Sequence, residues 1–276
     1  MMNKQEVLSI LEKYGLSATR SLGQNFLCNE DVIGKILDLA GISSATRVLE
    51  IGPGIGALSE QAVEMAGSYV AVEIDTTFRT RLSEVVGSKG GRVIYKDYLA
   101  FAASELSDEE SPDVVISNLP YYVMTPIMIK VMADFPLCRK MVYMVEEEAL
   151  ERILAKPGTK QYGPLSVLTS LFGEKEKCFS VDRGSFVPSP NTTSAVLTIT
   201  RHEGQNWEPE WIRFVESAFA LRRKTLVNSL STAGYEKESV VHALESTGKP
   251  VTVRTEQLEP CELVTLYDFL KGKDGE

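Results

Sequence analysis

The sequence predicts an α/β fold with a mostly parallel seven-stranded sheet, followed by a small all-helical domain. Short apolar runs alternate with amphipathic helical stretches before residue 202, which is the pattern of βαβ units. A polar break follows at 202–209, and beyond it every apolar spacing is helical. The length, 276 residues, allows one large core and one small core. We therefore expect a first domain at 1–201 and a second at 202–276.

The predicted strands are short, rich in Val, Ile or Tyr, and followed by polar or glycine-bearing turns, as buried parallel strands are. They lie at 47–51, 69–74, 92–95, 113–117, 141–145 and 195–200. Helical patterns fall at 55–66, 77–86, 125–133 and 146–155. The acidic segment 104–111, just before Pro112, is read as a solvated loop or short helix. Helical spacing then continues through 212–219, 226–230, 240–244 and 258–270.

The composition excludes several classes of protein. Hydrophobic residues make up 43% and charged residues 24% of the chain, which is ordinary globular usage and argues against disorder. The sequence has no apolar run long enough to span a membrane and no signal-peptide pattern. The four cysteines are far apart, so we read them as buried or idle thiols and expect no metal. We expect a cytoplasmic, monomeric protein with no membrane partner.

The charge balance argues against nucleic-acid binding. There are 29 Lys and Arg residues against 38 Asp and Glu residues, which gives a net charge of −9. Affinity for phosphate backbones comes largely from Lys and Arg that displace counterions.

A glycine-rich turn after the first sheet strand predicts a nucleotide-like cofactor. In EIGPGIGA, residues 50–57, Gly52 and Gly54 let the backbone approach a ligand at a helix N-terminus. The next strand ends near Glu73, where a carboxylate can accept both ribose hydroxyls. Gly52, Gly54 and Ala57 also fit a looser NAD fingerprint, and a plain tight turn stays open. Asp97, after the third strand, favours S-adenosyl-L-methionine because it could accept from the adenine amino group.

The segment SNLPYY, residues 117–122, indicates the chemistry. The lone pair of an exocyclic adenine amine is delocalised into the ring, so its methylation needs acceptors that favour a pyramidal nitrogen. The Asn118 side-chain carbonyl and the backbone carbonyl of Leu119 can supply two. Pro120 stiffens the turn, and Tyr121 offers a face on which a flipped-out base can stack. An ordinary turn with a buried tyrosine is the alternative.

Six motifs in order resemble the ribosomal small-subunit RNA adenine N6,N6-dimethyltransferases, the kasugamycin-resistance family. They are SLGQNFL, EIGPGIGALSE, VEID, NLPYY, FVPSP and RRKTL. The resemblance covers nearly the whole chain and implies a class I methyltransferase (Rossmann-like) fold. It also implies two methyl transfers to each of two neighbouring adenines in a terminal hairpin of the small-subunit RNA.

The resemblance also implies residue roles. Phe186 would join Tyr121 in sandwiching the target adenine. A basic cluster stands on a helix that begins the second domain and is the candidate RNA-binding element, with a solvated helical face as the alternative, namely Arg222, Arg223 and Lys224. The cofactor would touch residues from five segments, namely Asn25, Leu27, Gly52, Gly54, Glu73, Ile74, Asp97, Tyr98 and Asn118.

The chain departs from the family mainly by losing positive charge. Glu146 and Glu147 stand where the family commonly has Gln with Lys or Arg, and neutral residues replace basic ones at Pro164, Asn191 and Val227. We expect these positions to lie near the RNA path, where each lost phosphate contact weakens binding. The cofactor motifs show no such loss.

Three functions are therefore open. The first is N6-dimethylation of small-subunit ribosomal RNA, with the ribosome compensating for weak intrinsic charge. The second is a paralogue that methylates another RNA or a small molecule, and the third is a non-catalytic ribosome-assembly or RNA-binding factor. Methyl transfer from a sulfonium needs no general base because positioning supplies most of the rate. His202 and His242, the two histidines, are accordingly not expected to be catalytic.

Overall fold

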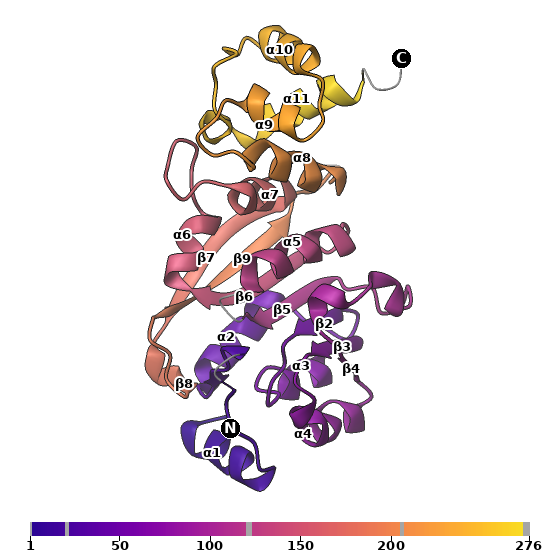
Figure 1. Ribbon diagram of the computed structural model, residues 1–276. Helices are drawn as coiled ribbons and strands as arrows, with labels where there is room; N and C mark the ends of the chain where they lie inside the picture. Colours follow the sequence, from indigo (N-terminus) through magenta and orange to yellow (C-terminus); the bar gives the residue numbers. More distant parts are fainter. Residues whose placement is uncertain (1, 20–21, 120–122, 205–206, 273–276) are drawn as a thin grey trace. The chain divides into compact units, whose positions relative to one another are not determined.

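A computed structural model of the chain describes residues 2–19, 22–119, 123–204 and 207–272 (Figure 1). The chain forms two compact units. Unit 1 runs to Leu150 and resumes over Glu174–Arg201, whereas unit 2 comprises Glu151–Gly173 and the residues from His202 onward. One boundary therefore falls at the predicted break. Residues 151–173, which the sequence analysis assigned to the first domain, cluster with the helical unit instead.

Unit 1 contains a seven-stranded sheet in the order β4-β3-β2-β5-β6-β9-β7. The five strands from β4 to β6 are parallel, and β9 is antiparallel to β6. The α/β class and the mostly parallel seven-stranded sheet are thus confirmed. The strand bounds are β2 Arg47–Ile51, β3 Ser68–Glu73, β4 Arg92–Tyr95, β5 Val114–Asn118, β6 Lys140–Glu146, β7 Gly173–Val181 and β9 Ser194–Arg201.

The sheet register brings the predicted motifs to one edge. Ile51 of β2 pairs with Val72 of β3 and with Ser117 of β5, so Gly52, Glu73 and Asn118 come at or just after neighbouring strand ends. Ligands of open α/β sheets bind at the carboxyl ends of the strands. The central strands therefore place all three residues where a site is expected.

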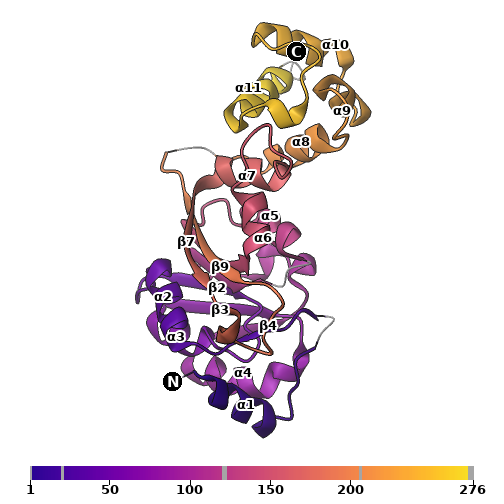
Figure 2. The same cartoon turned by 90° about the vertical axis from the view of Figure 1, so that its left-hand side faces the viewer.

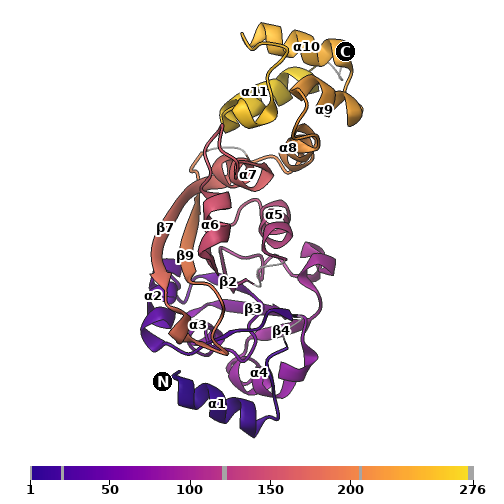
Figure 3. The same ribbon diagram turned by 60° about the vertical axis from the view of Figure 1, so that its left-hand side comes forward.

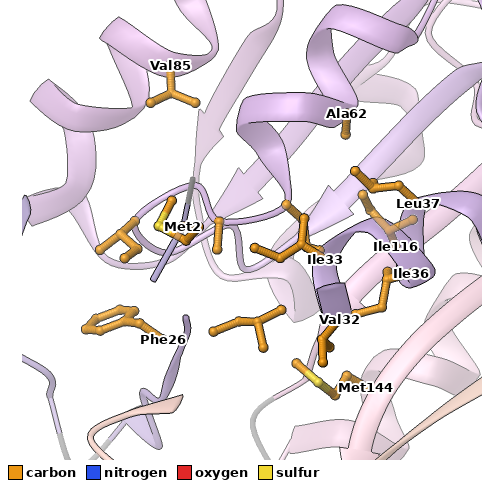
Figure 4. Packing of buried hydrophobic residues seen from close by; sticks show 14 of the residues in the cluster. Met2, Phe26, Val32, Ile33, Ile36, Leu37, Ala62, Val85, Ile116 and Met144 are labelled. Carbon is orange, nitrogen blue, oxygen red and sulfur yellow. The ribbon is translucent and has the colours of Figure 1, made fainter. Parts of the chain in front are cut away.

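Both faces of the sheet are buried. Val48, Ile116 and Val142 pack in one cluster with residues of α2, α3 and α4. Figure 4 shows Ile116 of this cluster beside side chains of α2. The alternate residues point to the other face, and α5 lies on the opposite side of the sheet from α2 (Figures 1 and 3). The helices of unit 1 are α1 Lys4–Lys13, α2 Glu30–Ala40, α3 Ser59–Met65, α4 Arg79–Val85 and α5 Met124–Asp134. The chain leaves the unit within α6, Glu147–Ile153.

The sequence analysis missed several elements. Strand β7 has the charged sequence GEKEKCFSV and no apolar alternation because it lies at the sheet edge beside β9 (Figure 2), where charges discourage further pairing. Strands β1 (Phe26–Leu27) and β8 (Phe186–Val187) are two residues each, too short for periodicity. Helices α1 and α2 did carry signals, since the side chains of Asn3 and Asn29 cap their N-termini.

Unit 2 is helical, as predicted for the residues after 202. Aromatic rings organise its core: Phe214 contacts Tyr235 and Tyr267 at centroid distances of 5.8 and 5.4 Å, and Trp207 contacts Phe172 and Trp211. Phe172 belongs to the segment that the sequence analysis placed in the first domain. The helices are α7 Pro164–Phe172, α8 Glu210–Phe219, α9 Leu226–Thr232, α10 Lys237–Ser246 and α11 Pro260–Lys271.

Candidate active site

A pocket in unit 1 lies at the carboxyl ends of the parallel strands, with the segment around β1 forming another wall. Pro120 and Tyr121 lie outside the described residues. The other predicted catalytic and cofactor-binding residues all line this pocket, namely Asn25, Leu27, Gly52, Gly54, Glu73, Ile74, Asp97, Tyr98, Asn118, Leu119 and Phe186. The fold thus gathers residues far apart in sequence, and their individual roles stay predictions.

The glycine turn has a conformation that explains its residue type. Gly52 and Gly54 have φ of +70° and +57°, a left-handed region that side chains disfavour. The Gly52 N–H donates to the Val72 carbonyl at 2.9 Å. A Cβ on Gly54 would meet the Phe26 ring at 3.5 Å. The turn is therefore fixed against β3 while its backbone lines the pocket.

Glu73 links this turn to the end of β3. Its Oε2 accepts from the Gly54 N–H and its Oε1 from the Asp75 N–H, both at 2.8 Å. The side chain is only 3% exposed. Burial raises its pKa, and the backbone donors, Asp75 first, oppose that rise. Because a carboxylate has about four acceptor positions, these two bonds leave capacity for ribose hydroxyls.

The segment around β1, which forms one wall of the pocket, is held in place by side-chain hydrogen bonds. Gln24 Nε2 donates to Asp75 Oδ2 at 2.8 Å, and Gln24 Oε1 accepts from the Thr19 N–H at 2.8 Å. Leu27 pairs with Phe186 across the antiparallel β1–β8 ladder. This pairing brings the predicted base-stacking residue Phe186 to the pocket from far along the chain.

Asn118 is oriented by the same wall. Its Nδ2 donates to the Asn25 carbonyl at 3.2 Å. The following N–H, of Leu119, donates to the Met144 carbonyl at 3.1 Å. Both of these donors are engaged by the protein, and the Asn118 Oδ1 and the Leu119 carbonyl stay the predicted pair of acceptors for amine methylation.

Three residues that were predicted to contact the cofactor, Asp97, Tyr98 and Ile74, differ in solvent exposure. Asp97 is exposed, and its Oδ1 accepts from the Leu99 N–H at 2.9 Å. Tyr98 is buried, stacks on Phe101 at 5.6 Å and directs its hydroxyl toward Asp134 at 3.4 Å. Ile74, in contrast, is 49% exposed. An exposed apolar side chain at a pocket edge can cover a flat aromatic ligand.

Two charged residues of the pocket were missed. Glu50 is 2% exposed, although it belongs to the quoted glycine motif. The signal was a carboxylate within the apolar strand RVLEI. Lys96 also lines the pocket, and its Nζ lies 2.8 Å from Glu105 Oε1. The lining thus holds three carboxylates, those of Glu50, Glu73 and Asp97, and fits a cationic nucleoside.

The basic cluster does not lie on a helix, contrary to prediction. Arg222, Arg223 and Lys224 form the turn between α8 and α9. The helix begins again only after Thr225, whose side chain caps α9 by accepting from the Asn228 N–H. Arg222 Nη2 donates to the carbonyls of Lys160 and Tyr162 at 2.6 and 3.3 Å. All three basic side chains are exposed in unit 2.

The glutamates that replace neutral or basic residues of the family, Glu146 and Glu147, have hydrogen-bond or ion-pair partners within unit 1. Glu146 accepts from Thr192 Oγ1 at 2.6 Å. Glu147 forms an ion pair with Lys177, and this bond holds the Glu147 pKa below its ordinary value. In unit 2, Val227 is buried in α9, so it does not stand for a lost surface charge. Glu146, Glu147 and Val227 therefore alter the surface less than the sequence suggested, whereas Asn191 is exposed and Pro164 is half-buried.

The sequence matches the family described as "Ribosomal RNA adenine dimethylase" over residues 15–267. A protein of Geobacillus thermodenitrificans named "Ribosomal RNA small subunit methyltransferase A" is 40% identical over 275 residues, covering 95% of this chain and 94% of that protein. A Bacillus cereus protein of the same name is also 40% identical, over 274 residues, with the same coverage.

Solved structures share the fold. A dimethyladenosine transferase from Plasmodium falciparum superposes with a TM-score of 0.74 at 24% identity, covering 90% of this chain and 98% of that one. The 23S rRNA methyltransferase ErmE gives 0.60 at 23% identity, covering 90% of this chain and 100% of that one. Among the described residues, no helix has both the length and the apolar character to cross a bilayer.

Proposed function

The chain belongs to the ribosomal RNA adenine dimethylase family, and on that basis we propose that the pocket of unit 1 is its active site. The enzyme is an S-adenosylmethionine-dependent methyltransferase that dimethylates N6 of adenines in small-subunit ribosomal RNA. Neither a paralogue with another substrate nor a non-catalytic assembly factor is favoured by the relatives, which are named as small-subunit methyltransferases.

The carboxylates and glycines of the pocket are proposed to bind the cofactor. Glu73 accepts hydrogen bonds from the ribose hydroxyls beside the Gly52 turn, and Asp97 accepts a hydrogen bond from the adenine amino group. Ile74 and Tyr98 flank the adenine, while the backbone at Asn25 and Leu27 encloses the methionine end. S-adenosylmethionine supplies an electrophilic methyl on a sulfonium. The residues hold this group in line with the acceptor, which is the main catalytic task.

One observation carries the catalytic assignment: the Asn118 amide nitrogen donates to the Asn25 carbonyl at 3.2 Å. This bond fixes which end of the amide serves as the acceptor. Asn118 Oδ1 and the Leu119 carbonyl would then accept both N6 hydrogens and make the nitrogen nucleophilic. Phe186, 3% exposed in the pocket wall, and Tyr121 would stack on the adenine. The amine proton leaves to solvent after transfer, so no general base is needed.

The exposed turn of Arg222, Arg223 and Lys224 is the proposed RNA-binding element of unit 2. Guanidinium and ammonium groups neutralise phosphates and release counterions, which offsets the net charge of −9 locally. A cytoplasmic location follows from a ribosomal substrate. A monomeric state stays a prediction that sedimentation would test.

The decisive experiment is transfer of labelled methyl groups to undermethylated small subunits, followed by nuclease mapping. We expect label at two neighbouring adenines, with two methyl groups on each. Asn118→Ala is the control, since it should bind S-adenosylhomocysteine but transfer methyl groups at least about a hundredfold more slowly. Absence of label with wild type, while S-adenosylmethionine still binds, would refute the ribosomal substrate and favour a paralogue.

A further inference from the structure

Glu50 is a buried acid of the pocket that the proposed mechanism does not use. It lies in β2, directly before the turn at Gly52, and lines the same cavity as Glu73. Its side chain is 2% exposed. Burying a carboxylate is costly unless its charge is compensated. The groups around Glu50 therefore decide whether it carries that charge.

The hydrogen-bond partners of Glu50 are neutral hydroxyls. Ser59 Oγ, at the start of α3, donates to Glu50 Oε2 at 2.8 Å, and the Tyr69 hydroxyl, from β3, donates to the same oxygen. Glu73, also on β3, faces Glu50 with like charge. Burial raises the pKa of Glu50 to about 7, the hydroxyl bonds lower it, and Glu73 raises it. The pKa of Tyr69 is well above its ordinary value, so Tyr69 keeps its proton near neutrality.

These partners suit either protonation state. A hydroxyl can donate to a carboxylate or accept from a carboxylic acid, whereas a backbone N–H can only donate. Glu73 is bonded by the N–H groups of Gly54 and Asp75, which oppose the rise of its pKa caused by burial and cannot accept from a protonated acid. The two acids of the pocket thus differ in whether their partners can also bond to the protonated form.

The reaction changes the charge of the bound cofactor by one. The bond between sulfur and methyl carbon breaks as a bond to N6 forms, and the sulfonium becomes a neutral thioether. Beside the three carboxylates, the basic residue lining the described pocket is Lys96, which is paired with Glu105. An acidic pocket with one titratable member can respond to the loss of the positive charge.

We propose that Glu50 is a specificity-determining residue that is ionised beside S-adenosylmethionine and protonated beside S-adenosylhomocysteine. The inference rests on the proposed cofactor pocket. A cation nearby favours the ionised carboxylate, so binding of the methyl donor releases a proton. After transfer, Glu50 takes up a proton from solvent, and the pocket loses the negative charge that favoured the sulfonium. The ionised form of Glu50 thereby favours the charged donor over its neutral product.

The test is calorimetric binding of both cofactor forms by wild type and Glu50→Gln at pH 6, 7 and 8. Each titration is repeated in two buffers of different ionisation enthalpy, so that released protons are counted. In wild type we expect the affinity ratio of S-adenosylmethionine to S-adenosylhomocysteine to rise about tenfold from pH 6 to 8, equivalent to a pKa change of one. The glutamine of Glu50→Gln cannot titrate. The affinity ratio of this variant should therefore change by no more than about twofold beyond the change caused by titration of the ligands themselves.

Two further variants complete the design. Glu64→Gln removes the same charge from a surface carboxylate of α3 that pairs with Lys89, and it should behave as wild type. Tyr69→Phe removes one donor that lowers the Glu50 pKa, so the pH dependence should move to higher pH. It keeps the test open if Glu50→Gln does not fold.

The outcomes separate the two proposals. Equal pH dependence and equal proton release in wild type and Glu50→Gln would overturn the role of Glu50. An unmoved midpoint in Tyr69→Phe would do the same. Wild type that binds neither cofactor form would instead contradict the cofactor pocket itself.

Discussion

Replacing Asn118 with alanine should separate catalysis from cofactor binding. Within the part of the chain that the structure describes, its side chain makes one hydrogen bond, from Nδ2 to the Asn25 carbonyl at 3.2 Å. A neutral hydrogen bond contributes about 0.5–1.5 kcal/mol, so the affinity for S-adenosylhomocysteine should fall by no more than about tenfold. An acceptor aimed at the reacting group is worth about 10²–10³ in kcat. The variant should therefore bind cofactor and transfer methyl groups at least about a hundredfold more slowly.

Asn118→Asp serves as the comparison for Asn118→Ala, because it keeps an acceptor oxygen but cannot donate to the Asn25 carbonyl. Its carboxylate oxygen would face the Asn25 carbonyl, so the acceptor would turn away from its productive orientation. We expect kcat to fall here as well, with little change in the affinity for the RNA. Single-turnover transfer measures the rate, and calorimetry with S-adenosylhomocysteine measures binding. Equal losses of binding and rate in Asn118→Ala would mean that Asn118 is chiefly a cofactor ligand and would refute the reasoning.

Glu73→Ala should weaken S-adenosylhomocysteine binding by about 1.5–3 kcal/mol, the range for a charged hydrogen-bonding group, and unchanged calorimetric affinity would remove its ribose role. Burial raises the pKa of Glu50 from 4.5 to about 7, so wild type should lose about 2–3 kcal/mol of stability relative to Glu50→Gln between pH 5 and pH 8. Urea unfolding followed by circular dichroism measures this loss of stability. Tryptophan fluorescence would not report on unit 1, because both tryptophans, Trp207 and Trp211, lie in unit 2. Parallel stability–pH profiles of wild type and Glu50→Gln would contradict the prediction. Glu147→Gln should release Lys177 from its ion pair and steepen the salt dependence of small-subunit binding by about one; an unchanged slope would place Lys177 away from the RNA.

Glu50 has a higher pKa in the folded protein than in the unfolded chain, so it ionises first in the unfolded chain as the pH rises. The contribution of Glu50 to stability is therefore fully present below pH 4.5 and is lost as the pH rises toward about 7. Glutamine can still accept from Ser59 and Tyr69 but has no such loss.

The sequence by itself determined the central strands, the glycine turn and the acceptor motif. Strand β2 reads as an apolar run, and Gly52 marks the left-handed turn after it, because burial on both faces and positive φ each constrain residues locally. The order of the motifs was enough to indicate the family. These features are encoded within a few neighbouring residues, which is why they could be recognised without coordinates.

The tertiary structure alone decided what lies beside these motifs. Asn25 bonds to Asn118 and Leu27 pairs with Phe186 because sheet register and the β1–β8 ladder join distant segments, and no local pattern specifies such pairs. The edge position of β7 explains its charged sequence. The basic cluster, predicted on a helix, lies in a turn because α9 begins only after its N-cap residue Thr225. The altered pKa of Glu50 arises from complete burial with Ser59 and Tyr69, and burial depends on packing from every side of the carboxylate.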